Sequence, residues 1–373
     1  MRKILFVSTH FPSSLGGMRR LYHNMLDFSP YFEVHFMHIR LPKEPRMAEI
    51  SLPKSVKFCE TTASGMSFDP LALTLPICLS RIMRIRSAQG EVSRYVQENN
   101  ISALVVHPID ACIALRDVRA PAKVAELLDS VENYYSSKHI ASRSLSTLLL
   151  SKAARPLFFA MQKALMPHYD LFTFVSEPDR LSCIFPRERT IACEGRDAPQ
   201  KSQNFSRPND IVLFGRWEHP PNRDGLKKIL PLLSSTGASV LIIGPNFPKN
   251  LPLPKNVRVQ GFVENVEDAL SHSKICLIPV WYGAGLQNKV FDALKNGCKV
   301  VSTPFTQKTF EANGFSSNAI AYSENPVAAA TGALSNYSKK DASDAYSAYE
   351  KFFALSHSKQ QEYAKKVLAL CTP

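Results

Sequence analysis

Long apolar runs are absent from the sequence, since no uninterrupted stretch reaches the roughly 18 residues that a membrane-spanning helix needs. The eight cysteines include no Cys-X-X-Cys pair, so the usual spacing of a structural zinc site is missing. Several of them lie within apolar runs, which favours reduced, buried thiols and a cytoplasmic location. The chain has a basic start, but its short first apolar run meets His10 and Pro12 without a cleavage site. We interpret this segment as the first strand of a fold and not as a signal peptide.

Acidic side chains are comparatively scarce: 45 basic residues against 32 acidic ones give a formal net charge of +13. The basic excess is spread over both halves of the chain, and neither end is a basic tail. The sequence shows no aromatic-plus-basic platform for single strands and no recognition-helix pattern, so we expect no nucleic-acid partner. Anionic lipid headgroups and anionic nucleotide substrates both fit the charge.

Short apolar runs alternate with helical segments along the 373 residues, which predicts an α/β protein with mostly parallel sheets. A polar, proline-containing stretch at 199–209 divides two such blocks, and we interpret it as a linker. The pattern therefore predicts two Rossmann-like, doubly wound domains that face a cleft, at residues 1–198 and 210–340. Residues 341–373 are helical in composition, and we expect them to pack back on the first domain.

The stretch 275–304 has the order strand, glycine loop, helix, strand. Gly283 and Gly285 at the strand-to-helix junction would let the backbone approach a ligand closely, and the helix N-terminus would present free N–H groups to an anion. Lys289 and Asp292 lie three residues apart, so both can line one face of the helix. A loop for phosphate, a cation for its charge and a carboxylate for ribose hydroxyls together predict a nucleotide-diphosphate site.

A second glycine loop follows the first predicted strand, with Gly16 and Gly17 directly before a helix. This loop is a candidate for binding an acceptor or a phosphate, although a plain tight turn explains the same residues. Arg19 and Arg20 would lie in the first turn of that helix, where cations oppose the helix dipole, and this weakly indicates an anionic ligand or a membrane.

In the order of its motifs the chain resembles the GT-B-fold glycosyltransferases, specifically the retaining enzymes of glycosyltransferase family 4. The resemblance covers nearly the whole chain and is most specific in residues 210–305. Its motifs are the Gly16-Gly17 loop, Ser176–Asp179, Phe214–Trp217, Pro221–Leu226, Ile242–Pro245, Arg258–Val263 and the stretch GAGLQNKVFDALKNGCKVVST, which resembles the donor loop and helix of the family.

The resemblance implies transfer of a sugar from a nucleotide-sugar to an acceptor, with retention of the anomeric configuration and without a metal or other cofactor. The sequence contains no Asp-X-Asp pair to hold Mg²⁺ against a diphosphate, so cations must neutralise the leaving nucleotide. Asp292 stands where the family usually has a glutamate, at the ribose. The implied donor-binding residues are Gly215, Arg216, Gly283, Gly285, Leu286, Lys289 and Asp292.

Two departures from the family pattern concern the reacting sugar. No acidic residue stands seven positions before the ribose acid, and the histidine that many members carry after the strand at 123–127 is missing. Asp129, which follows that strand, and His107, which ends another, are the candidate catalytic residues. A single histidine in such a position is also commonly a packing residue.

We expect an acceptor that is lipid-linked or a saccharide, in the synthesis of a surface polysaccharide. Two basic, apolar segments, 71–86 and 139–163, could hold the protein peripherally on the anionic inner face of the cell membrane, or could be core-packed helices with extended basic side chains. The missing glutamate and histidine leave a non-catalytic accessory or scaffold protein as an alternative. A nucleotide-sugar epimerase of the same fold is a third.

Overall fold

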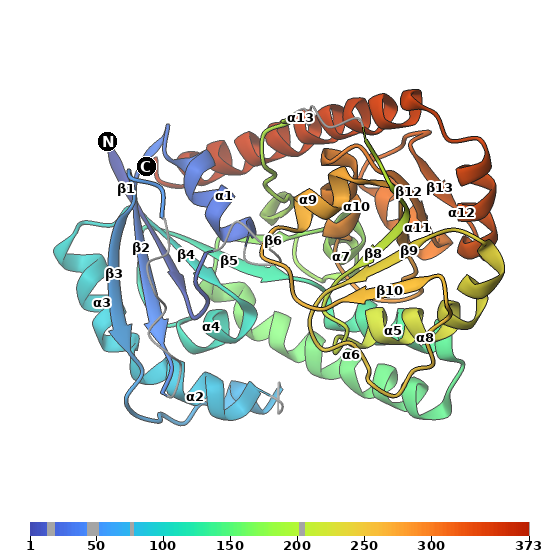
Figure 1. Ribbon diagram of the computed structural model, residues 1–373. Coiled ribbons are helices and arrows are strands. Elements are labelled where there is room, and N and C mark those ends of the chain that lie inside the picture. Colours follow the sequence, from blue (N-terminus) through green and yellow to red (C-terminus); the bar gives the residue numbers. More distant parts are fainter. Residues whose placement is uncertain (13–18, 43–51, 75–77, 201–205, 373) are drawn as a thin grey trace. The chain divides into compact units, whose positions relative to one another are not determined.

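The computed structural model describes residues 1–12, 19–42, 52–74, 78–200 and 206–372 (Figure 1). The chain divides into two compact units. The first comprises residues 1–139, 143–197 and 355–373, and the second comprises residues 140–142 and 198–354. Each unit is built around one parallel sheet, and the two are described separately.

The first unit contains a seven-stranded sheet in the order β3-β2-β1-β4-β5-β6-β7, with all neighbours parallel. This is the doubly wound order, in which the chain reverses direction across the sheet between β1 and β4. The strands are β1 (Arg2–Ser8), β2 (Phe32–Arg40), β3 (Lys57–Thr62), β4 (Ala103–His107), β5 (Ala122–Leu128), β6 (Leu171–Phe174) and β7 (Thr190–Ala192). The helices are α1 (Arg19–Phe28), α2 (Leu79–Ser87), α3 (Gln89–Glu98), α4 (Ile109–Ala114), α5 (Val131–Ser142), α6 (Leu145–Leu165) and α7 (Glu177–Ser182).

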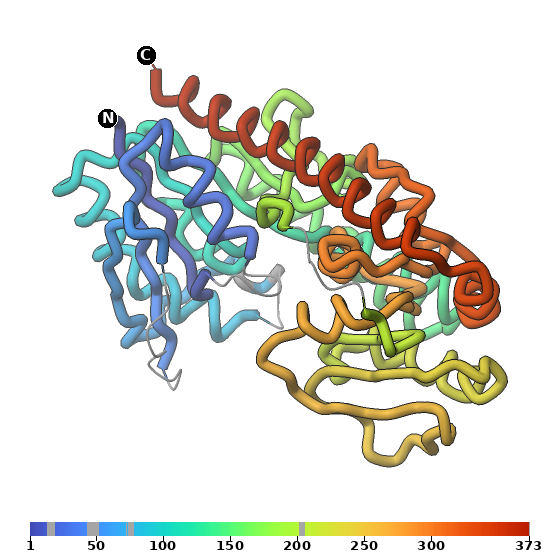
Figure 2. The backbone as a smooth tube through the Cα atoms, turned by 45° about the horizontal axis from the view of Figure 1, so that its top comes forward, coloured from blue at the N-terminus to red at the C-terminus, as the bar shows by residue number. Residues whose placement is uncertain are grey.

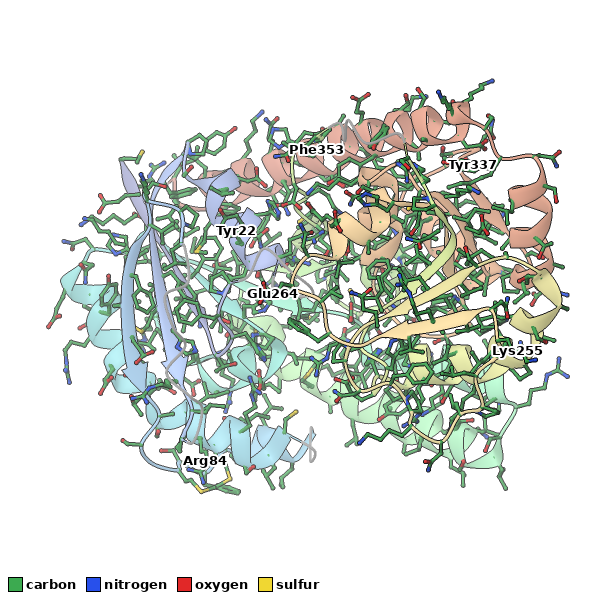
Figure 3. All side chains as sticks on the ribbon, in the orientation of Figure 1. Tyr22, Arg84, Lys255, Glu264, Tyr337 and Phe353 are labelled. Carbon is green, nitrogen blue, oxygen red and sulfur yellow. The ribbon has the colours of Figure 1, made fainter. Side chains whose placement is uncertain are left out.

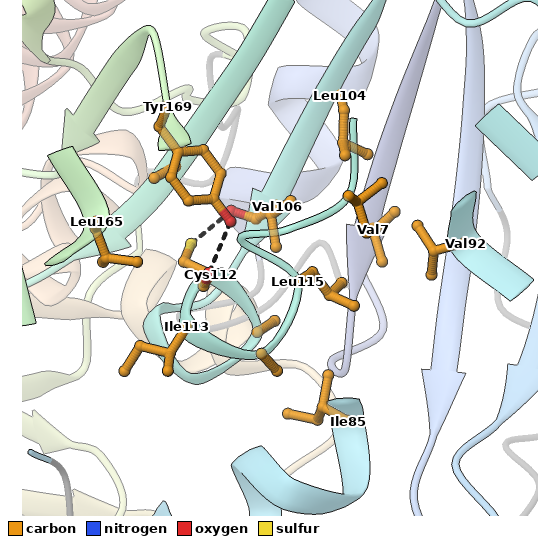
Figure 4. Packing of buried hydrophobic residues seen from close by; sticks show 14 of the residues in the cluster. Val7, Ile85, Val92, Leu104, Val106, Cys112, Ile113, Leu115, Leu165 and Tyr169 are labelled. Carbon is orange, nitrogen blue, oxygen red and sulfur yellow. Dashed lines mark hydrogen bonds between the residues drawn. The ribbon is translucent and has the colours of Figure 1, made fainter. Parts of the chain in front are cut away.

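Apolar side chains of this sheet supply two cores, one on each face. In β1, Leu5 and Val7 belong to one cluster while Ile4 and Phe6 belong to the other, because successive side chains of a strand point to opposite faces. Figure 4 shows part of the first cluster, in which the Tyr169 hydroxyl donates a hydrogen bond of 2.7 Å to the Cys112 carbonyl. The continuous apolar run of the sequence is thus explained by burial on both sides.

The second unit contains a six-stranded sheet in the order β10-β9-β8-β11-β12-β13, again with all neighbours parallel. Its reversal lies between β8 and β11. The strands are β8 (Asn209–Phe214), β9 (Val240–Ile243), β10 (Val257–Gln260), β11 (Ser273–Ile278), β12 (Lys299–Ser302) and β13 (Ile320–Tyr322). The helices are α8 (Pro220–Ile229), α9 (Val266–Ser271), α10 (Asn288–Lys295), α11 (Pro304–Ala312) and α12 (Pro326–Ser335).

The last helix, α13 (Lys339–Leu370), contributes residues up to Ala354 to the second unit and the rest to the first. Its final turns place Tyr363, Ala364 and Val367 in the core of the first unit. The N- and C-terminal ends of the chain lie close together (Figure 2), and Arg2 donates a hydrogen bond of 3.3 Å to Thr372.

The segment 71–86 does not form the free basic amphipathic helix that one interpretation of the sequence predicts. Ile82 and Ile85 of α2 are fully buried in the core. Arg81 forms an ion pair with Asp110 at 2.5 Å, and Arg86 forms one with Asp69 at 3.0 Å. The side chain of Arg84 extends from the same helix (Figure 3). Core packing of the two isoleucines and ion pairs of two arginines therefore give α2 a structural role within the first unit.

All eight cysteines are free thiols. In the part of the chain that the structure describes, no helix is both long and apolar enough to span a bilayer. The same residues contain no group of three or more His, Cys, Asp and Glu side chains arranged to hold a metal ion.

Candidate functional site

The predicted donor-binding residues lie at the carboxyl ends of β8 and β11, where the strand order of the second sheet reverses. Gly215 directly follows β8, and the loop with Gly283 and Gly285 lies between β11 and α10. In open α/β sheets a ligand binds at this point of reversal, because the loops on either side diverge there. The fold therefore places these three glycines in the expected position for a ligand.

Lys289, in the first turn of α10, is set among protein atoms at this edge. Its ammonium donates a hydrogen bond of 2.8 Å to the Asn222 side-chain oxygen and lies 5.9 Å and 5.6 Å from the ring centroids of Phe214 and Trp217. Burial lowers the pKa of Lys289 from 10.5 to about 8, and the nearby Asp292 opposes that fall. The amine thus stays largely protonated at neutral pH. Burying this charge costs free energy, and an anionic ligand bound beside it would offset that cost.

The backbone beneath this lysine is packed so closely that it requires glycine. A Cβ atom at Gly215 would lie 2.4 Å from the Lys289 ammonium nitrogen, and the φ angle there is +151°, which residues with side chains rarely adopt. A Cβ at Gly244 would lie 1.9 Å from the Gly215 carbonyl oxygen. A side chain at either position would therefore displace the lysine or the strand end that supports it.

The loop before α10 turns through Gly283 and Gly285, with φ angles of +156° and +71°. The capping residue Gln287 makes no side-chain hydrogen bond to the helix. Leu286 is half-buried within the same loop. Hydroxyls of the next strand hold the start of the loop: Thr303 donates to the Val280 carbonyl, and Ser302 donates to the Ile278 carbonyl at 2.8 Å.

Two predicted donor-binding residues have less distinctive surroundings. Arg216 is 79% exposed, and its guanidinium pairs with Glu218 at 2.6 Å. Asp292 is half-buried on α10, one turn beyond Lys289, and lies near enough to influence the lysine electrostatically. Their assignments to the diphosphate and the ribose stay predictions.

In the first unit, Asp129 follows β5 at the carboxyl edge of the sheet. Leu128 before it has a φ angle of +66°, in the left-handed region that non-glycine residues rarely adopt. Desolvation by the surrounding protein, together with the negative charges of Asp179 and Glu194, raises the pKa of Asp129 to about 7. The positive charge of Arg20 lowers this pKa by a smaller amount. A carboxyl with such a pKa can accept or donate a proton near neutral pH.

His107, the other catalytic candidate, is fully buried. Its Nδ1 lies 3.1 Å from Glu126, and Glu126 also accepts hydrogen bonds from Asn24 and from the Tyr363 hydroxyl. Arg20, likewise buried, lies 3.9 Å from the same carboxylate. This network joins β4, β5, α1 and α13 within one unit, and the burial of His107 is typical of a structural histidine.

Sequence reasoning missed three further groups at this edge. His10 follows β1, and burial together with Arg81 lowers its pKa to about 4. Glu126 stands among the apolar residues of β5 between Ala125 and Leu127, and a charged residue at such a position could have marked it in the sequence. Glu194, which pairs with Arg196 at 2.6 Å, follows β7 without any local pattern to mark it. The predicted loop glycines Gly16 and Gly17 lie outside the described residues.

Residues 208–337 match the family model of the glycosyl transferases group 1. This part of the chain is thus similar to the glycosyl transferases group 1. The matched range begins at β8 and ends after α12, so it contains Gly215, the glycine loop and Lys289. A comparison with curated protein sequences gives no match.

Solved structures of glycosyltransferases have a similar fold over nearly the whole of this chain. Sucrose-phosphate synthase from Thermosynechococcus elongatus is 14% identical, with a TM-score of 0.66 over 98% of this chain and 99% of that one. HepE from Anabaena in complex with UDP is 12% identical, with a TM-score of 0.63 and the same coverage. The lipopolysaccharide outer core galactosyltransferase WaaB is 11% identical, with a TM-score of 0.60 over 97% and 99%. The predicted α/β GT-B fold and the predicted enzyme class, glycosyltransferase, are confirmed.

Proposed function

We propose that the chain transfers a sugar from a nucleoside-diphosphate sugar to a lipid-linked or saccharide acceptor, with retention of configuration, in the synthesis of a surface polysaccharide. The observation that carries this proposal is the enclosed Lys289 ammonium above the Gly215 cradle, at the point where the second sheet reverses. The likeness to HepE, which is described in complex with UDP, supports a nucleotide at this site.

The chemical role of the lysine follows from the charge that develops during transfer. When the bond between the sugar C1 and the diphosphate oxygen breaks, negative charge accumulates on the leaving nucleotide, and a preorganised cation stabilises it. Lys289 supplies that cation, and the N–H groups at the start of α10 supply hydrogen bonds. We therefore propose that transfer needs no divalent metal ion.

The first unit is proposed to take the acceptor. Asp129, with its pKa near 7, suits a hydrogen bond to the acceptor hydroxyl that forms the new bond to C1. The likeness to WaaB, a lipopolysaccharide galactosyltransferase, supports a surface polysaccharide as the product.

A panel of nucleotides and nucleotide-sugars, tested for thermal stabilisation and then for transfer, examines the proposal. A ligand that binds only the folded state raises the melting temperature, so one nucleoside diphosphate and its sugar should stand out. The anomeric configuration of the product, read by NMR, should equal that of the donor. Binding without transfer to any acceptor would favour the accessory-protein alternative, and a free isomerised nucleotide-sugar would favour an epimerase. Absence of any nucleotide binding would refute the proposal.

A further inference from the structure

Helix α6 carries leucines on two of its faces, and only one face is covered. Thr147, Phe158, Met161, Gln162 and Leu165 are buried, and three of them belong to the first core of unit one. Four leucines of the helix are exposed: Leu145 and Leu149, at 71% and 60%, lie opposite the buried residues, and Leu150 and Leu157, at 49% and 40%, lie on its flank. A helix that is apolar all round normally has partners on every side, so this exposed apolar face indicates an interaction surface.

Basic side chains share this exposed face. Leu145, Leu149, Lys152, Pro156 and Lys163 follow one another at spacings of four, three, four and seven residues, which places them along one side of the helix. Lys152 and Lys163 are exposed. We name these five residues the outer α6 face. In Figure 1, α6 is the long green helix that carries this face.

The charged side chains of α6 itself all have one sign. The 21 residues of α6 include Lys152, Arg155 and Lys163 and no acidic residue. The neighbouring carboxylate of Glu132 on α5 pairs with Arg155 at 3.2 Å and leaves both lysines uncompensated by it. Exposed leucines followed by lysines on one face fit an anionic bilayer, because the apolar side chains enter the acyl boundary while the lysines reach the headgroups.

We infer that the outer α6 face binds an anionic lipid bilayer and holds the enzyme where a membrane-borne acceptor is presented. This inference rests on the proposed function for the acceptor, but lipid binding itself is independent of catalysis. It moves the membrane contact from the segment 71–86, whose Ile82 and Ile85 are in the core, to α6. A second copy of this chain is disfavoured, because two copies of the outer α6 face would bring the exposed lysines of one against those of the other.

Flotation of the full chain with vesicles of phosphatidylglycerol and phosphatidylcholine tests the inference. The wild type should float with the anionic vesicles at low salt, float poorly with purely phosphatidylcholine vesicles, and dissociate as salt rises. The double variant Lys152→Gln/Lys163→Gln should lower the partition coefficient about 30-fold, at about fivefold per lysine. The double variant Leu145→Gln/Leu149→Gln should lower it at least ~10-fold through lost apolar insertion.

Matched controls come from exposed residues elsewhere in the chain. Leu181→Gln/Leu232→Gln replaces leucines that are 51% and 46% exposed, and Lys255→Gln replaces an exposed lysine labelled in Figure 3. These controls should float like the wild type. Equal flotation of the α6 variants and the wild type would overturn the inference. So would a wild type that ignores vesicles and forms dimers which Leu145→Gln/Leu149→Gln converts to monomers.

Nucleotide binding by each variant, measured by calorimetry, separates the two proposals. The α6 variants should bind the nucleoside diphosphate like the wild type. Lost flotation with intact nucleotide binding supports the membrane inference. Intact flotation with no nucleotide binding in any protein would leave lipid binding standing while the proposed function fails.

Discussion

Replacing Lys289 by methionine should make the protein more stable and less able to bind its nucleotide. The pKa of the buried amine falls from 10.5 to about 8, and at 1.36 kcal/mol per pH unit this corresponds to ~3 kcal/mol of lost stability at neutral pH. Methionine has a similar length and carries no charge. Because Asn222 would lose the hydrogen bond that it now accepts from the lysine, we expect a net gain of about 1–3 kcal/mol.

The pH dependence of this gain has a definite sign. Below about pH 8 the lysine is protonated in both folded and unfolded chains, so the full cost of burial applies. Between about 8 and 10.5 the unfolded chain binds more protons than the folded one, and the free energy of unfolding of the wild type rises with pH. The difference between Lys289→Met and wild type should therefore be largest below pH 8 and shrink above it.

Chemical denaturation at several pH values measures the gain, and calorimetric titration with the nucleoside diphosphate measures binding. Loss of a hydrogen bond to a charged group, worth ~1.5–3 kcal/mol, should weaken nucleotide binding by at least tenfold. Lys295→Met on the same helix is the matched control, because Lys295 is buried and pairs with Glu267 at 2.8 Å. It should leave nucleotide binding unchanged. A Lys289→Met protein that is less stable than wild type and binds the nucleotide equally well would refute the reasoning.

Three further predictions follow from the two strand edges. Gly215→Ala should weaken nucleotide binding more than tenfold in calorimetric titration, because the added Cβ would clash with Lys289. Gly90→Ala in α3 is the control and should bind the nucleotide normally, because a Cβ there has no atom within 4 Å. Asp129→Asn should lower the turnover number by about 10²-fold or more and remove the rise in rate through about pH 7, and an unchanged pH–rate profile would contradict its role. Transfer should persist in excess EDTA, and activity lost on chelation and restored by Mg²⁺ or Mn²⁺ would disprove metal independence.

The strands of both sheets follow closely from the sequence where burial is two-sided. The run predicted as the first strand is β1, Arg2–Ser8, and the predicted strand at 275–278 lies within β11, Ser273–Ile278. A parallel strand covered by helices on both faces must be continuously apolar, and this signal needs no knowledge of its neighbours. The glycine loop with Lys289 could be predicted for a similar reason, since its residues are close together in the chain.

Helix boundaries and the surroundings of charged residues were harder to predict. The basic, apolar segment 139–163 is divided between two helices, since α5 ends at Ser142 and α6 begins at Leu145. Arg81 and Arg86 resemble membrane-facing residues in the sequence, but carboxylates far along the chain pair with both. Helical periodicity shows which residues are apolar, and it does not show what covers them.

The sequence by itself determined the alternation of strands and helices, the two α/β blocks, the glycine loop and the lysine on the helix behind it, because each depends on neighbouring residues. Only the tertiary structure brought Asn222 to Lys289, surrounded Asp129 with Asp179 and Glu194, and left the leucines of α6 uncovered. These features depend on contacts between distant segments. A pKa or an exposed surface is set by everything packed around a side chain, and that is decided when the chain folds.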